Sequence, residues 1–192
     1  MLPPRKPKNT EVRPREYLTE HEIDALMGSA RKIAPRHGHR NATLILLAYR
    51  HGLRVAELIA LRWDRIDLSK ALLSVRRVKN GVDTVHPLHA PELRALRKLH
   101  RDYPETPYVF VTERRGPLTD SAVRKIVAQA GHEAGMTFPV HPHMLRHACG
   151  FTLANAGHDT RSIQLYLGHR YIQHTVRYTA LSAERFKGFW ND

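Results

Sequence analysis

Apolar residues recur along most of the chain at intervals of three and four, the spacing that predicts helices with one buried face. The first such helix begins at a capping-box pair, Thr19 and Glu22, and carries Ile23, Leu26 and Met27 on one side. The same periodicity predicts further helices at residues 40–51, 55–61, 91–101, 119–134, 143–156 and 159–167, with a short amphipathic one at 182–190.

The period changes near the middle of the chain. Residues 71–78 and 84–88 have the pattern of two strands joined through Asn80-Gly81, a dipeptide typical of hairpins, and residues 108–111 are a candidate third strand. The sequence therefore predicts one mainly α domain with a small antiparallel β-sheet, an α+β fold, spanning residues 17–192. Residues 1–16 are rich in proline and positive charge, and they are expected to form a flexible basic tail.

The charge of the chain changes this picture by pointing to a partner. There are 31 Lys and Arg residues against 18 Asp and Glu, a formal net charge of +13. Such an excess favours a polyanion, usually nucleic acid, bound either by an enzyme or by a passive basic protein.

Cys149 is the only cysteine, so no disulfide joins two parts of the chain, and no apolar run is long enough to span a bilayer. A cytoplasmic, nucleoid-associated location without membrane contact is expected.

The first segment with potential chemistry is GLRVAEL, residues 52–58. Gly52 is expected to end the preceding helix in a left-handed conformation, which places Arg54 directly after the cap. A guanidinium can hold two phosphate oxygens in one plane, and Glu57, one helical turn further on, can hold that guanidinium. Taken alone, the pair can equally be a local surface ion pair.

The second segment is HPHMLRH, residues 141–147. His143 and Arg146 are three residues apart and share one face of a helix, so an imidazole and a cation would point into one site. A zinc site or a packed histidine is the alternative. No cysteine pair and no HExxH pattern accompanies these histidines, which weighs against zinc.

The third segment is Leu167-Gly168-His169, with Tyr178 nine residues after the histidine. Gly168 is expected to cap a short helix. A histidine that follows a helix end, or a single tyrosine, is usually structural. Neither residue alone indicates a function.

In this order and spacing, the three segments resemble the tyrosine recombinase (phage integrase) family over roughly residues 18–190. The resemblance implies the fold of the family's catalytic domain. It assigns the catalytic residues as Arg54, Lys79, His143, Arg146, His169 and the nucleophile Tyr178, with Glu57 and His147 in support. Lys79 takes the place of a lysine that the family carries on a β-hairpin, and Arg76 and Arg77 are its near competitors.

The resemblance also implies a reaction. Tyr178 would attack a DNA phosphodiester while Arg54, Arg146 and His169 stabilise the charge that grows on the phosphate oxygens. His143 would accept the phenolic proton and Lys79 would protonate the leaving 5′-oxygen. The product is a 3′-phosphotyrosine that keeps the energy of the broken bond, so neither ATP nor a metal is required. The sequence has no GxxxxGK[ST] loop and no acidic cluster typical of a two-metal nuclease.

Within the family, the small size and the 141–170 stretch resemble the fimbrial phase-variation recombinases, which invert a promoter segment. The expected partners are double-stranded DNA, a homo-tetramer on two recombination sites and DNA-bending accessory proteins. Arg76, Arg77, Arg124 and Lys125 are expected to bind the DNA. A separate core-binding domain, usual in the family, is not expected, which predicts weak DNA binding by the monomer. A type IB-like topoisomerase and a catalytically silent regulator of the same fold remain the alternatives.

Overall fold

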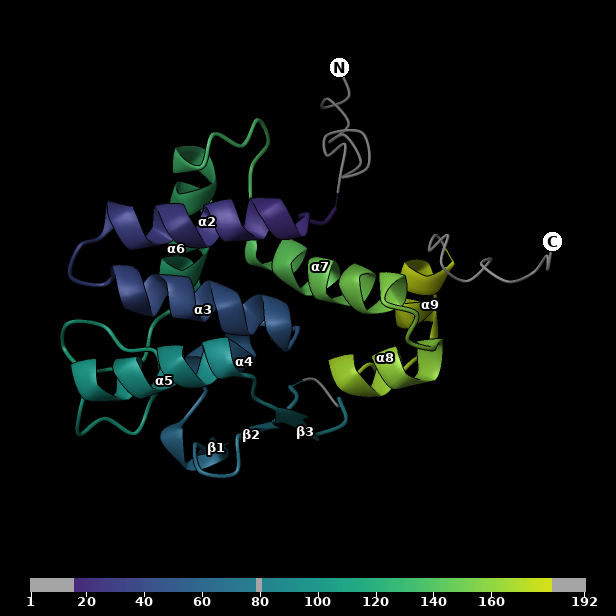
Figure 1. Cartoon of the computed structure of the whole chain (residues 1–192), viewed down its shortest axis with the longest axis horizontal. Helices are drawn as coiled ribbons and strands as arrows, with labels where there is room; N and C mark the ends of the chain where they lie inside the picture. Colours follow the sequence, from purple (N-terminus) through teal and green to yellow (C-terminus); the bar gives the residue numbers. More distant parts are fainter. Residues whose placement is uncertain (1–15, 79–80, 181–192) are drawn as a thin grey trace, which may run out of the picture.

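The computed structural model describes residues 16–78 and 81–180 and is mainly helical, as predicted. Its helices are α2 (Glu20–Ile33), α3 (Gly38–Arg50), α4 (Val55–Ile59), α5 (Ala90–Asp102), α6 (Asp120–Glu133), α7 (Pro142–Asn155), α8 (Thr160–Leu167) and α9 (Gln173–Thr179), with a 3₁₀ turn, η1 (Trp63–Arg65) (Figure 1). None of these described helices is both long and apolar enough to cross a membrane. The predicted tail at 1–16, except for its last residue, and the predicted helix at 182–190 lie outside the described residues.

The helix ends follow the signals in the sequence. At the start of α2 the Thr19 hydroxyl accepts from the Glu22 N–H at 3.3 Å, and the Glu22 carboxylate accepts from the Thr19 N–H at 2.8 Å. Gly52, after α3, has φ +55°, and Gly168, after α8, has φ +65°. The predicted left-handed cap at Gly52 and the predicted cap at Gly168 are therefore confirmed. Arg54, two residues after Gly52, and His169, directly after Gly168, line the same cavity, described below.

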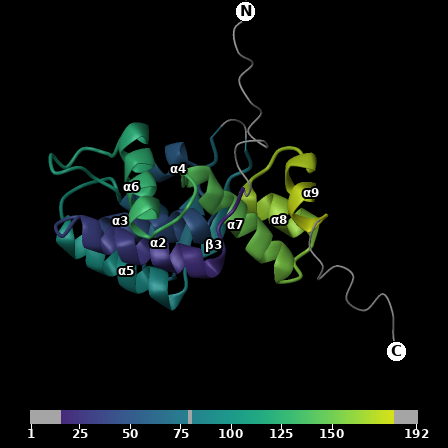
Figure 2. The same cartoon turned by 90° about the horizontal axis from the view of Figure 1, so that it is seen from above.

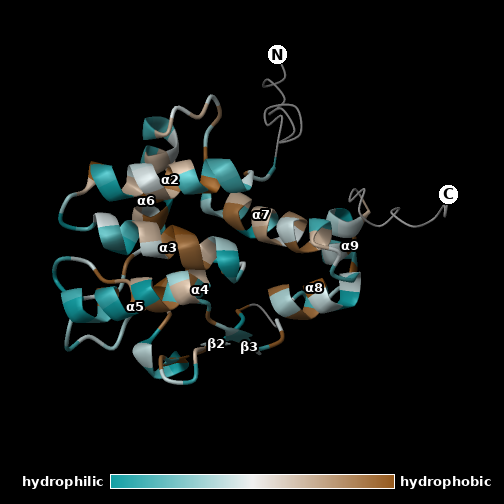
Figure 3. Cartoon of the chain, viewed as in Figure 1, coloured by the Kyte–Doolittle hydropathy of each residue, from teal (hydrophilic) through white to brown (hydrophobic). Residues whose placement is uncertain are grey.

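Helix α3 lies at the centre of the hydrophobic core. It is buried nearly all round and packs against α2, α5 and α7. Figure 3 shows the apolar residues of the helices gathered on the sides that face one another. Helices α7, α8 and α9 gather at one end of the molecule, with α9 packed on both of the others (Figures 1 and 2).

The sheet is antiparallel and has the order β1-β2-β3, with β1 Ile66–Asp67, β2 Leu72–Val75 and β3 Thr84–Pro87. The predicted pairing of the two central strands is confirmed, and Val75 lies opposite Thr84. The first of these strands is shorter than the predicted 71–78, because Arg77 leaves the ladder: its N–H donates to the Asp83 carboxylate at 2.7 Å and its side chain turns inward.

The prediction of a third strand at 108–111 is wrong, since the third strand is β1. Tyr108 and Val111 make only isolated bridges, to Arg62 and Pro117. A turn closed by the Thr112 N–H and the Gly116 carbonyl follows them at once and ends the extended stretch. Their apolar run reflects burial in the core, which periodicity alone does not distinguish from a strand.

Candidate functional site

A cavity of about 390 Å³ lies where α4, α7 and α9 meet the loop after α8. The three segments singled out in the sequence all reach it, although more than a hundred residues separate the first from the third. The predicted site residues that line it are Arg54, His143, Arg146, His147, His169 and Tyr178. The structure thus brings together all the predicted site residues of the three segments except Glu57, which pairs with Arg54 just behind it.

Tyr178 is held from two sides on helix α9. Its hydroxyl lies 2.9 Å from Nδ1 of His147, and its ring packs edge-on against Phe151 and directly over Gly150 of α7. Only 2% of the residue is exposed. Burial raises the pKa of the phenol, and the Arg146 guanidinium partly offsets that rise. Because the resting hydroxyl is protonated, attack on any substrate requires a proton acceptor.

Arg146 is a buried cation held by backbone oxygens. Its guanidinium donates to the carbonyl of Leu167 at 2.8 Å and to the carbonyl of Gly52. These carbonyls lie at the ends of α8 and α3, where helix dipoles favour positive charge. Burial, followed by repulsion from Arg54, lowers its pKa to about 10, so it stays protonated at neutral pH.

Arg54 and Glu57 form the other wall. The Glu57 carboxylate accepts from the Arg54 backbone N–H at 2.9 Å and from its guanidinium at 2.8 Å. A second guanidinium, that of Arg77, lies 2.9 Å from the other carboxylate oxygen. Burial alone would raise the pKa of Glu57, but Arg77 and Arg54 outweigh burial and lower it. The anion fixes Arg54, whose guanidinium still reaches the cavity.

Three histidines of the cavity, His143, His147 and His169, have lowered pKa values and are therefore neutral at neutral pH. Burial, followed by the electrostatic effect of His143, lowers the pKa of His147 to about 4. Burial, followed by Arg146, lowers that of His169 to about 3, and burial also lowers that of His143. The His169 Nδ1 lies 2.8 Å from the Thr175 hydroxyl, which fixes the ring. A neutral imidazole can donate one proton and accept another, as acid–base catalysis requires.

Sequence reasoning missed four residues that also line the cavity: Arg170, Tyr171, His174 and Arg177. Three of them carry basic groups, and Arg177 lies with its guanidinium 5.9 Å from the centre of the Tyr178 ring. They belong to the loop after Gly168 and to α9, whose mixed β-branched and polar sequence gave no helical signal. The signal available in the sequence was the density of basic and aromatic residues, which number four in the eight positions from 170 to 177.

The residues expected to bind DNA fall into different environments. Arg76, Arg124 and Lys125 are exposed, and the charge of Arg124 acts on His143. Arg77 is not available to DNA here, because its side chain is fully buried against Glu57. Lys79 lies outside the described residues. The residues around it are Val78, whose N–H donates to Glu57, and Gly81, which lines the cavity.

Metal ligation receives no support from the described part of the chain, where no three His, Cys, Asp or Glu side chains are grouped to hold an ion. The histidines around the cavity instead stack edge-on on one another, as His143 and His147 do with ring centres 4.4 Å apart. The arrangement is that of a cation-lined site for an anion, with a phenol and neutral imidazoles beside it.

Known proteins resemble this chain over almost all of its length. The model of the Phage integrase family matches residues 16–185. The type 1 fimbriae regulatory proteins FimE and FimB of Escherichia coli strain K12 are 46% and 44% identical over 182 residues. That alignment covers 92% of this chain and 91% of FimE and 90% of FimB. The crystal structure of XerA recombinase superposes with a TM-score of 0.76 at 27% identity, over 96% of this chain and 64% of that one.

Proposed function

This chain belongs to the phage integrase family of tyrosine recombinases, and from that premise we propose that it is a DNA invertase of the phase-variation type. The names of its relatives FimE and FimB, regulators of type 1 fimbriae, support inversion of a regulatory segment. The observation that carries the chemistry is the Tyr178 hydroxyl, which opens onto a cavity that it shares with Arg54 and Arg146.

In the proposed reaction the phenolic oxygen of Tyr178 attacks the phosphorus of a DNA phosphodiester. A bond forms between that oxygen and phosphorus, and the bond from phosphorus to the 5′-oxygen breaks. The phenolic proton passes to an imidazole, and the leaving 5′-oxygen takes up a proton, for which Lys79 is the proposed donor. The 5′-hydroxyl of another strand then reverses these steps and rejoins the DNA without any external source of energy.

His147 is the proton acceptor that this geometry favours, since its Nδ1 is already 2.9 Å from the hydroxyl. The family resemblance pointed to His143 instead. His143 lies edge-on to His147, and its own lowered pKa keeps it neutral, so it can receive the proton from His147 or meet the phosphate. In our proposal the two histidines therefore share the acid–base role, with His147 in direct contact.

Arg54, Arg146 and His169 are proposed to stabilise the overcharged phosphorus centre. Their positions are fixed before substrate arrives, by Glu57, by two backbone carbonyls and by Thr175 respectively. Donors that need no rearrangement are commonly the largest contribution to catalysis, and the loss of one typically lowers the rate by about 10²–10³-fold.

The DNA itself is proposed to lie across the face that carries Arg76, Arg124 and Lys125. Contacts of this kind are made mainly to phosphate and weaken with salt. Inversion requires two cut sites to exchange ends, so we propose a tetramer of the chain on two sites, assembled with the help of DNA-bending proteins.

The decisive experiment uses a nicked DNA duplex that traps the covalent intermediate, carrying the recombination site mapped from protein-linked DNA ends in cells. Wild-type protein is expected to become linked to a 3′-phosphate. Tyr178→Phe is expected to give no linkage, while it keeps the ring packing over Gly150 and therefore the fold. The matched control is Tyr171→Phe, which alters another tyrosine of the same cavity and is expected to retain linkage. Equal linkage by Tyr178→Phe would refute the assignment of the nucleophile.

A plasmid with two inverted copies of the mapped site tests the outcome of the reaction. Inverted product supports the proposed function. Relaxed plasmid without inversion would point to a type IB-like topoisomerase that uses the same chemistry without exchanging partners.

A further inference from the structure

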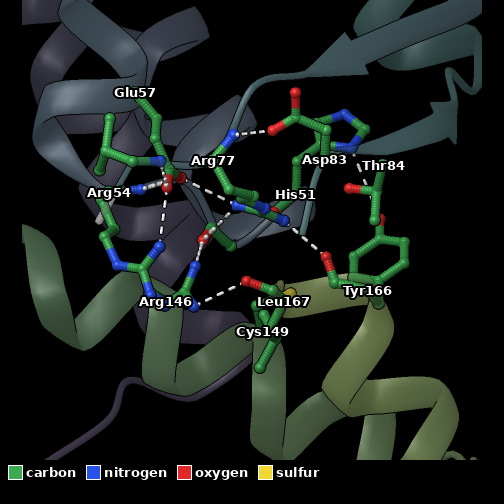
Figure 4. Close-up of polar contacts among 12 residues, drawn as sticks. His51, Arg54, Glu57, Arg77, Asp83, Thr84, Arg146, Cys149, Tyr166 and Leu167 are labelled. Atoms are coloured by element: carbon green, nitrogen blue, oxygen red, sulfur yellow. Dashed lines mark hydrogen bonds and ion pairs between the residues drawn. The ribbon is translucent and has the colours of Figure 1, made fainter. Parts of the chain in front are cut away.

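Arg77 lies between the first catalytic segment and the end of helix α8, although none of the family motifs includes it. Figure 4 shows its guanidinium between Glu57 on one side and Tyr166 on the other. The guanidinium donates to Glu57 at 2.9 Å, to the Tyr166 carbonyl at 2.5 Å and to the His51 carbonyl at 3.3 Å. These partners belong to α4, α8 and the end of α3, so one side chain joins the elements that hold the site.

Two of its acceptors also serve the proposed catalytic arginines. Glu57 binds Arg54 with one carboxylate oxygen and Arg77 with the other. The Gly52 carbonyl accepts from Arg146 and, at 3.4 Å, from Arg77. A shift of Arg77 therefore moves an acceptor of each cation that would bind the phosphate.

The stem of Arg77 fixes the loops as well. An added Cβ at Gly168 would lie 2.6 Å from the Arg77 Cγ, and one at Gly81 would lie 2.7 Å from the Arg77 Cβ. Gly168 directly precedes His169, and Gly81 follows Lys79 by two positions in the sequence. The Arg77 N–H also donates to the carboxylate of Asp83, two positions beyond Gly81. The side chain of Arg77 therefore packs between Gly168, in the loop that carries His169, and Gly81.

An arginine suits this place better than a lysine. Its planar guanidinium offers five N–H donors in fixed directions, whereas an ammonium is a point charge that reaches fewer acceptors at once. Burial lowers the pKa of Arg77, and Glu57 counteracts that effect. The cation and its carboxylate are both almost fully buried, so each depends on the other for its charge.

We propose that Arg77 is a positioning residue for DNA cleavage: it sets the places of Arg54 and Arg146 through their shared acceptors, without touching the DNA. This inference rests on the proposed function. It differs from a purely structural role because it requires the rate of the chemical step to fall in protein that is folded and bound to DNA.

The test compares Arg77→Met and Arg77→Lys with wild type in single-turnover cleavage of the nicked substrate at saturating protein, together with DNA affinity and thermal unfolding. For folded Arg77→Met we expect cleavage to slow by about 10–100-fold, since misplacement by about 1 Å can cost 10² in rate. DNA affinity should stay within about threefold, because the side chain makes no contact with phosphate. Arg77→Lys keeps the charge opposite Glu57 and should recover part of the rate.

Arg40→Met is the matched control. Arg40 is also a buried arginine, and it donates to the Val111 carbonyl at 2.6 Å and to Asn41, away from the cavity. Its loss should lower the unfolding temperature but leave the cleavage rate of the folded fraction unchanged.

The inference is overturned if folded Arg77→Met cleaves at the wild-type rate, or if Arg40→Met slows cleavage as much. If Arg77→Met does not fold, Arg77→Lys decides: a wild-type rate refutes the proposal, and slowed cleavage with retained affinity supports it. Should wild-type protein itself form no DNA linkage, the proposed function fails, and the role of Arg77 falls with it for that separate reason.

Discussion

Gly150 leaves the space in which the ring of the proposed nucleophile, Tyr178, packs against helix α7. A Cβ at this position would lie 2.6 Å from Cε2 of Tyr178 and 2.7 Å from Cδ2, closer than real Cβ atoms approach. Since α7 is packed on its other sides, the ring has to give way. The hydroxyl would then lose its place beside His147.

Gly150→Ala is therefore expected to slow covalent linkage to DNA and to destabilise the fold by roughly 1–3 kcal/mol, the usual cost of overpacking. Single-turnover cleavage and urea unfolding measure the two effects. The control is Gly28→Ala, in helix α2, where nothing lies within 4 Å of the added methyl group. That variant is expected to be stabilised by about 0.5–1 kcal/mol and to cleave normally. If Gly150→Ala cleaved DNA at the wild-type rate, the packing of the Tyr178 ring over residue 150 would not control the rate of cleavage.

Among single residues, the sequence motifs identified several of those that line the cavity. The motifs did not identify residues whose role depends on contacts that only the folded chain makes. Arg77 looked like a DNA-binding residue because a basic residue on a hairpin usually is exposed. Only the fold reveals that Glu57, twenty positions earlier, is buried beside it. His174 and Arg177 belong to no motif, and they reach the cavity because α9 turns back onto α7.

Helix α6 is the element expected to hold DNA. It is capped by Thr119, whose hydroxyl accepts from the Ala122 N–H at 3.2 Å, and it exposes Arg124 and Lys125 one turn beyond. Arg124 also pairs with Asp120 on the same helix, and its charge is a minor contribution to the lowered pKa of His143, after burial, Arg146 and Arg54.

Lys125→Gln should weaken DNA binding for all sequences alike and reduce the slope of log K against log salt by about one, as the loss of one phosphate contact does. Titrations at several salt concentrations measure the slope. Lys98→Gln on α5, where the ammonium instead pairs with Asp102 at 2.8 Å, is the control and should leave the slope unchanged. A slope unaffected by Lys125→Gln would place the DNA elsewhere.

Among the elements, those with a strong period or a cap were predictable, and those that owe their form to partners were not. The capping box of α2 and the glycine ends of α3 and α8 were all visible in the sequence. Strand β1, only two residues long, exists because β2 pairs with it. The segment 108–111 was mistaken for a strand because it is apolar and residues 109–111 are fully buried in the core.

For the molecule as a whole, buried neutral histidines make stability depend on pH. Burial, followed by the charge of His51, lowers the pKa of His86 to about 3, and the pKa values of His147 and His169 are lowered to about 4 and about 3. In the unfolded chain these imidazoles titrate near ~6.5. Between these values the unfolded state binds more protons than the folded state, so folding stability falls as pH falls.

The unfolding temperature is therefore expected to be nearly constant above pH 7 and to decrease steadily as the pH is lowered from about 6.5 towards 4. Differential scanning calorimetry at a series of pH values measures this. His86→Asn, which removes a histidine that is only 1% exposed, should flatten the curve, whereas His132→Gln at the exposed end of α6 should not. A melting temperature that rises on acidification would contradict the assigned neutral state.

The composition of the cavity also has a consequence for which copy of the chain would supply the residues that cleave the DNA. The cavity of a single chain holds the proposed nucleophile Tyr178, both of the proposed phosphate-binding arginines and the three histidines proposed to act with them. The Tyr178 hydroxyl lies 2.9 Å from Nδ1 of His147 of the same chain. In the proposed reaction each copy of the chain would therefore cleave DNA with its own tyrosine. Copies assembled on two sites, as proposed, would then need to exchange only the cut DNA ends and not their nucleophiles.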